Sequence, residues 1–353
     1  MKTRYIVGSL FALALMGQKV SAQDIHFSQY AETPSSINPA LAGVTYDTRI
    51  IANYKSQWSK VGNKYLTVGF SFEQAIKHKK LKNNYFAIVA NIFRDAAGDA
   101  RLNTLNPNLG FTYLQKINKK MKLSGGVQSG FFYRTIDVST LHTDSQWDPS
   151  TLTFDPGRNN GEPTTPRSSI TSFDLGGGVN LNYVQSDKFL SAKNAAKFDV
   201  GVSAYHYSIG RNSFIITDEK LMTRFCTYFN GDFNIPGSIN AIMPSFLFMR
   251  QGTNTEFVAG ALFKFIIGDP STYTSLKKPR ALSIGGYYRY KDAIIPSLLF
   301  QYNKYAIGVS YDINVSALTP ASNRIGGLEL MLRYNLFPGY GINLGRTDTR
   351  PSY

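Results

Sequence analysis

The feature that most constrains the fold is a strict two-residue alternation, which is clearest over Lys304–Asn314. Apolar side chains take every second position, and small or polar side chains take the positions between them. An amphipathic helix would instead need apolar residues three and four positions apart. The pattern is typical of a membrane-spanning β-strand, with one face toward lipid and the other toward a polar interior. The apolar face holds Tyr305, Ile307, Val309, Tyr311 and Ile313.

The same alternation recurs along most of the chain and predicts an all-β protein, a transmembrane antiparallel β-barrel of about 14 strands in a bacterial outer membrane. Alternation alone is also compatible with a soluble β-sandwich. Pro244 lacks a backbone donor and predicts a bulge or a mouth position in its strand. The predicted strands are Arg49–Trp58, Tyr65–Gln74, Tyr85–Arg94, Asn106–Lys116, Lys122–Arg134, Ile170–Tyr183, Lys197–Tyr207, Thr223–Phe233, Ala241–Arg250, Glu256–Ile267, Arg280–Tyr290, Ile294–Tyr302, Tyr305–Asn314 and Gly327–Phe337.

The chain divides into four parts by composition. Residues 1–22 have the basic start, short apolar run and small-residue cleavage site of a signal peptide, so we expect an exported protein. Residues 23–45 are expected to form a periplasmic N-terminal segment, which either precedes the first strand or folds into the barrel mouth as a plug. Residues 46–337 are expected to form the barrel, and residues 338–353 a C-terminal tail.

Charge and length of the connections suggest how the barrel is oriented. The longest connection, about Thr135–Ser169, follows the fifth strand and faces outward if both termini are periplasmic. Lysines concentrate in the opposite connections, for example at Lys116, Lys119, Lys120 and Lys122. Because these basic residues do not form a helix or a stacking platform, we expect lipid head groups or acidic periplasmic proteins as partners, and no nucleic acid.

Charged residues inside the strands leave two interpretations of the interior open. Their positions in the alternation point inward, where a barrel tolerates charge. The interior is then either internally salt-bridged and plugged, or an open pore. The residues concerned are Asp199, Lys264, Arg289, Asp312, Glu329 and Arg333.

No residue pattern indicates catalysis, a cofactor or a metal. The four histidines lack the spaced partners of a zinc site, and phosphate-binding and nucleophile motifs are absent. His142 and Asp144 in the longest connection offer a dyad for an outer-membrane enzyme, which is the weakest hypothesis. The single cysteine, Cys226, lies on a strand and is expected to be lipid-facing or packed, without a catalytic role.

Several short motifs at both ends of the mature chain resemble the PorP/SprF family of Bacteroidota outer-membrane proteins. They are Phe27-Ser28-Gln29-Tyr30, Asn38-Pro39-Ala40 with Ala42-Gly43, Tyr54-Lys55-Ser56-Gln57-Trp58, Pro244-Ser245-Phe246, Tyr311-Asp312-Ile313, and Gly326-Gly327-Leu328-Glu329-Leu330 with Leu332-Arg333-Tyr334. Members of that family usually end near the last strand, whereas this chain continues through residues 338–353.

The resemblance implies a non-enzymatic barrel of the type IX secretion system and of gliding motility. Its expected role is an adaptor or anchor for secreted surface proteins, such as adhesins with C-terminal sorting domains, linked to periplasmic secretion and gliding ring components. A channel for small solutes is the alternative. The candidate partner-binding residues are Phe27, Gln29, Tyr30, Asn38 and Pro39, for which a purely structural plug role is the competing interpretation.

Overall fold

The structure, a computed structural model, describes residues 24–57, 65–77, 83–98, 101–137, 144–155, 157–158, 161, 167–185, 195–207, 213–214, 221–267, 280–316, 319 and 323–335. The predicted signal peptide, His142 and the C-terminal tail 338–353 lie outside the described residues. The division of the chain into four parts stays a prediction.

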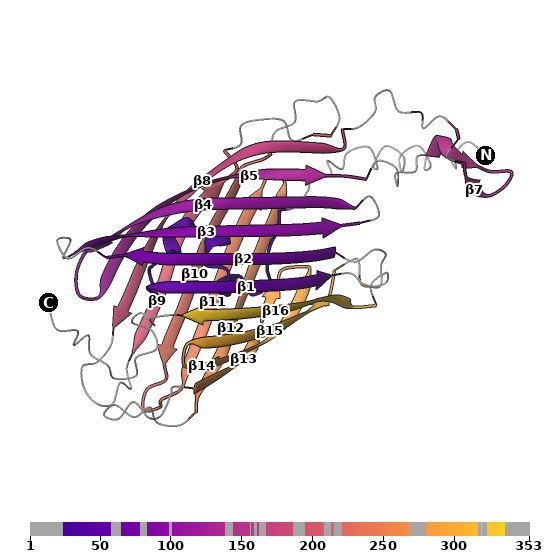
Figure 1. Ribbon diagram of the computed structural model, residues 1–353. Coiled ribbons are helices and arrows are strands. Elements are labelled where there is room, and N and C mark those ends of the chain that lie inside the picture. The colour runs from indigo at the N-terminus through magenta and orange to yellow at the C-terminus, as the bar shows by residue number, and fades with distance from the viewer. Residues whose placement is uncertain are drawn as a thin grey trace, which may run out of the picture.

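Fourteen antiparallel strands form a closed barrel in which neighbours in the sequence are neighbours in the sheet (Figure 1). The first and last strands, β1 and β16, pair with each other and close the ring. The predicted fold class is therefore confirmed. The barrel strands are β1 Thr48–Gln57, β2 Tyr65–Ile76, β3 Asn84–Ala97, β4 Leu102–Lys116, β5 Met121–Thr135, β8 Ser169–Gln185, β9 Ala196–Tyr205, β10 Arg224–Asn234, β11 Ala241–Gln251, β12 Asn254–Ile266, β13 Arg280–Arg289, β14 Ala293–Tyr302, β15 Tyr305–Asn314 and β16 Ile325–Asn335.

The alternation read from the sequence decides which side chains face the interior. In β15, Tyr305 and Ile307 are about half exposed on the outer surface, whereas Ala306 and Ser310 are buried. Apolar side chains on the outside meet hydrocarbon, and closure of the sheet lets the backbone polar groups pair between neighbouring strands, without a free edge. The fold therefore satisfies both demands of a bilayer with strands alone. Within the described residues, no helix is long and apolar enough to cross a membrane.

Proline affects the strand ladder without producing the predicted bulge. The pairing of β10 with β11 omits Met243 and Pro244 and then resumes in the same register. Pro244 thus removes a hydrogen bond but inserts no extra residue, so of the two predicted alternatives the bulge is wrong. As the fourth residue of β11, Pro244 lies near one end of its strand. The register shift between described strands lies instead at Asp312/Ile313, between β15 and β16.

The two ends of the barrel differ in their connections. At one end, here called the turn end, residues 117–120 join β4 tightly to β5. At the other, the loop end, residues 136–168 join β5 to β8 and carry a 3-10 turn, η4 (Asp144–Gln146), with the small hairpin of β6 (Trp147–Asp148) and β7 (Thr153–Phe154). This hairpin projects beyond the barrel wall (Figure 1).

Candidate functional site

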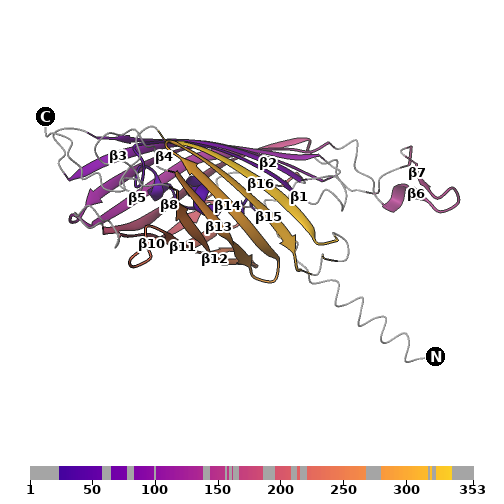
Figure 2. The same cartoon turned by 90° about the horizontal axis from the view of Figure 1, so that it is seen from below.

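The candidate site is the lumen, because residues 24–47 run through it from one end of the barrel to the other. Asp24 at the loop end contacts His206, directly after β9, and Arg224 at the start of β10. Thr45 at the turn end accepts a hydrogen bond from Lys197, near the start of β9. We call residues 24–47 the plug. Its short helical turns are enclosed by the strands in Figure 2.

Local sequence explains how the plug stays compact inside a polar wall. It contains η1 (Tyr30–Glu32), α2 (Pro34–Ile37) and η2 (Pro39–Leu41). Proline suits the first position of a helical turn, because its fixed φ matches the helix and its missing N–H needs no partner there. The Asn38 side chain caps η2 by accepting a hydrogen bond from the Ala40 amide at 2.9 Å.

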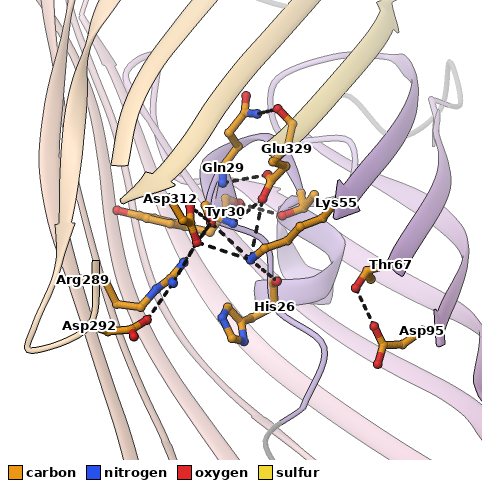
Figure 3. Close-up of polar contacts among 12 residues, drawn as sticks. His26, Gln29, Tyr30, Lys55, Thr67, Asp95, Arg289, Asp292, Asp312 and Glu329 are labelled. Atoms are coloured by element: carbon orange, nitrogen blue, oxygen red, sulfur yellow. Dashed lines mark hydrogen bonds and ion pairs between the residues drawn. The ribbon is translucent and has the colours of Figure 1, made fainter. Parts of the chain in front are cut away.

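A buried ion cluster holds the first part of the plug (Figure 3). The backbone amides of Ser28 and Gln29 donate to the Glu329 carboxylate on β16 at 2.7 and 2.9 Å. The Ser28 hydroxyl donates to Asp312 on β15 at 2.7 Å. Charge-assisted hydrogen bonds of this kind are stronger than neutral ones. The wall carboxylates therefore fix the plug backbone.

Two wall cations neutralise those carboxylates. Lys55 on β1 lies 3.9 Å from Glu329 and donates to the Ser28 hydroxyl at 3.2 Å. Arg289 on β13 donates to Asp312 at 3.1 Å and to Ser28 at 2.9 Å. Burying charge is costly unless it is paired and hydrogen-bonded. Plug atoms therefore supply part of the hydrogen bonding that these buried charges need.

A second group of contacts holds the middle of the plug. The Asn38 amide donates to the carbonyls of Val179 and Val202 and to the Tyr228 hydroxyl, at 3.0, 3.2 and 3.2 Å. Asn38 is completely buried. Its three contacts come from β8, β9 and β10, so one side chain ties three strands to the plug.

Glycine in the wall allows this close approach. A Cβ added at Gly126 on β5 would lie 2.5 Å from the Ala40 nitrogen, and one at Gly178 on β8 would lie 2.5 Å from the Asn38 side-chain oxygen. Thr112 and Ser124 then donate to the carbonyls of Pro39 and Ala40, both at 2.7 Å. Plug and wall are thus in direct backbone contact here.

Aromatic packing covers the remaining plug surface. The Tyr30 ring lies 5.8 Å from that of Tyr287, and its hydroxyl accepts from Ser245 at 2.8 Å. The Phe27 ring lies 6.0 Å from that of Phe93. The five predicted partner-binding residues are all buried against the wall, and a role toward a partner stays a prediction.

Histidine joins the loop end of the plug to the wall. His206 is hydrogen-bonded through Nε2 to Asp24 at 2.8 Å and through Nδ1 to Asp174 at 3.2 Å. Burial alone would lower the pKa of His206, but the Asp24 and Asp174 carboxylates raise it by more, so its pKa lies above the ordinary value. Burial also opposes ionisation of Asp24, yet Arg224 and His206 hold the pKa of that carboxyl well below its usual range.

The predicted inward charges all lie on the lumenal side, mostly in ion pairs. Lys264 pairs with Asp232, and Arg333 pairs with Glu32 of the plug. The cavities that the described residues line are small, for example about 50 Å³ beside Gln29 and Tyr287 and about 30 Å³ beside Asp24 and His206. The interior is therefore the plugged and salt-bridged one of the two predicted alternatives.

Sequence reasoning overlooked Lys55 and the two wall glycines as plug contacts. Lys55 stands at an inward position of β1, so the rule that identified the other inward charges would also have identified it. Cys226 is packed in the lumenal core. Asp144 is exposed in η4, and among the described residues no cluster of three or more potential metal ligands occurs.

The chain is distantly similar to several solved structures. CdiB from Acinetobacter baumannii has 8% identity and a TM-score of 0.41, and the match covers 82% of this chain but only 60% of CdiB. BamA from Haemophilus ducreyi lacking POTRA domains 1-3 has 9% identity and a TM-score of 0.39, covering 82% of this chain and 70% of that one. No curated protein matches the chain.

A family comparison is more informative. The profile of the type IX secretion system membrane protein PorP/SprF matches residues 19–334, which is nearly the whole chain. A closed barrel with an apolar outer surface is the form in which a strand-built protein crosses a bacterial outer membrane. Sequence, fold and family agree on an outer-membrane location. The chain belongs to the PorP/SprF family of type IX secretion system membrane proteins.

Proposed function

We propose that this barrel is an adaptor that anchors secreted surface proteins, such as adhesins with C-terminal sorting domains, and connects them to the periplasmic secretion and gliding machinery. The observation that carries the proposal is the plug, because a family member with a filled lumen offers surfaces for binding and no path for solutes. The proposed role is binding, without a catalytic step.

The course of the plug supports an adaptor with two working ends. The plug contacts the wall through Asp24 at the loop end and through Thr45 at the turn end, so one segment connects both ends of the barrel. We propose that Phe27, Gln29, Tyr30, Asn38 and Pro39 serve partner binding indirectly, by fixing the plug on which both faces depend. The loop end would face the cell exterior, and the turn end the periplasm.

Surface display in a deletion strain tests this function. Loss of the gene should abolish display of the partner adhesin while the adhesin is still synthesised, and a plasmid copy should restore display. A copy with Lys55→Met, which removes the cation between Asp312 and Glu329, should restore it poorly. Unchanged display in the deletion strain would refute the adaptor role.

A further inference from the structure

Five lysines gather at the turn end around the β4–β5 turn. We call them the lysine patch, and they are Lys116, Lys119, Lys120, Lys122 and Lys197. Lys116 and Lys122 are direct partners across β4 and β5. Lys119 and Lys120 are exposed in the turn between these strands, and Lys197 lies near the start of β9.

The patch surrounds the point where the plug leaves the barrel. Lys116 and Lys122 share the lumenal side of their strands with Leu114 and Ser124, which are buried. Lys122 donates to the Val44 carbonyl at 3.1 Å, and Lys197 donates to the Thr45 hydroxyl at 3.2 Å. These three lysines therefore border the barrel mouth and do not point to the lipid.

Most lysines of the patch lack the close ion pairs seen elsewhere at this end, although Asp232, which pairs with Lys264, lies directly across the sheet from Lys197. Lys77, Lys264 and Arg333 each pair with a carboxylate, those of Asp47, Asp232 and Glu32. By contrast, Lys116, Lys119, Lys120 and Lys197 form no ion pair with any residue that the structure describes. Like charges placed directly opposite each other, as Lys116 and Lys122 are, destabilise a sheet.

Hydrogen bonds fix the backbone of the turn that carries Lys119 and Lys120. The Asn118 side chain accepts hydrogen bonds from the amides of Lys120 and Met121 at 2.8 and 2.9 Å. The Ile117 amide donates to the Met121 carbonyl at 3.0 Å. Because the backbone of the turn is already ordered, binding an anionic partner costs no backbone entropy there.

We infer that the lysine patch is a docking surface for an acidic segment of a periplasmic protein, which lies across the mouth next to Val44 and Thr45. Complementary charge of this kind sets the association rate and the specificity of an interface. Lipid phosphates would meet side chains on the outer wall, whereas Lys116, Lys122 and Lys197 border the mouth. The inference rests on the proposed orientation, with the turn end in the periplasm.

Binding of a labelled peptide rich in Asp and Glu tests the inference, with the full mature chain in nanodiscs of uncharged lipid. The wild type should bind with an affinity that falls as salt is added. Lys116→Gln/Lys197→Gln should bind about tenfold more weakly, as expected for two surface ion pairs. The matched control, Arg250→Gln/Lys291→Gln at the loop end, should bind like the wild type, and a peptide with Asn and Gln instead should not bind.

Thermal stability distinguishes a binding role of Lys116 from a structural one. If Lys116 served only to stabilise the barrel, its replacement would lower the unfolding temperature. Lys116→Gln removes the repulsion with Lys122, so this variant should unfold at a slightly higher temperature while it binds the acidic peptide less well. Equal binding by the wild type and the Lys116→Gln/Lys197→Gln variant would overturn the inference. So would an equal loss in the loop-end control.

A further arm separates protein from lipid. If the patch variants lose affinity only for membranes containing phosphatidylglycerol, and bind the peptide normally, then the patch contacts lipid and the inference is wrong. This assay uses purified components, so its failure would leave the surface-display result, and the adaptor role, standing on its own.

Discussion

Gly126 and Gly125 are adjacent residues of β5 that face opposite sides of the wall. A Cβ at Gly126 would lie 2.5 Å from the Ala40 nitrogen, whereas one at Gly125 would have nothing within 4 Å. Gly126→Ala should therefore lower the free energy of unfolding by about 1–3 kcal/mol, the usual cost of overpacking. Gly125→Ala is the matched control and should leave it nearly unchanged. Thermal unfolding in detergent measures both, and equal midpoints would contradict the close contact.

His206 makes the loop end of the plug sensitive to pH. Its pKa is raised in the folded state by Asp24 and Asp174, against burial and the nearby Arg224. A raised pKa means that the stabilisation is complete below the ordinary value of about 6.5 and is lost as the pH rises through the folded value. As the pH rises from about 6.5 through the raised pKa of the folded state, the Asp24 contact should therefore weaken, by about 1 kcal/mol for the lost charge-assisted bond.

Amide hydrogen exchange at Ile25–Phe27 measures this effect. Expressed as protection, which removes the intrinsic pH dependence of exchange, it should fall about fivefold from pH 6 to pH 9 in the wild type. His206→Gln cannot be protonated, and its protection should stay constant over the same range. A wild type with constant protection would show that His206 does not titrate in this range.

Among the elements, the strands were predictable and the plug was only partly so. The strand pattern repeats every two residues, because alternate side chains face lipid and lumen, so all fourteen barrel strands were located within a few residues. The plug has no repeat, and Pro34 and Pro39 indicate only an irregular segment. Its path depends on Ser28, Asn38 and their wall partners, of which Glu329 and Val179 are more than a hundred residues away in the sequence.

The plug as an element accounts for closure of the lumen. Deleting residues 24–44 removes the groups that fill the interior and leaves the inward charges to water, which a polar lumen accommodates. The full chain should pass no steady current in a planar bilayer, and the deletion variant should pass a stable one. Deleting the β6–β7 hairpin, residues 147–154, is the control, and this variant should pass no steady current. A current through the full chain would instead support the channel function.

For the whole molecule, orientation in the membrane is the property on which the proposed function depends. Lys291, between β13 and β14, is exposed at the loop end, and Lys119 is exposed at the turn end. In a background with the buried Cys226 replaced by Ser, a membrane-impermeant maleimide should label Lys291→Cys but not Lys119→Cys on intact cells. Both should react after permeabilisation. The reverse pattern would place the turn end outside.

Orientation and partners could be predicted from the sequence only in outline. The long connection after β5 and the basic opposite connections suggest which face is which, because bacterial barrels have short periplasmic turns. No periodicity encodes a binding partner, however, and Lys116 becomes informative only when its neighbour across the sheet is known to be Lys122. The pairing of Lys116 with Lys122 follows from the strand register and cannot be read from the composition.

The pairing of β1 with β16 limits the order in which this molecule can be assembled. These strands come from opposite ends of the barrel sequence, and the plug contacts both, through Lys55 and Glu329. If β1 paired with β16 before the plug was in place, Asp24 would have to pass through the entire charged interior to reach the loop end. If the plug instead packs on the open sheet before β1 pairs with β16, this passage is avoided. The free edges of β1 and β16 then expose backbone polar groups that hydrocarbon cannot solvate. The strands should therefore enter the bilayer only after the sheet has closed around the plug.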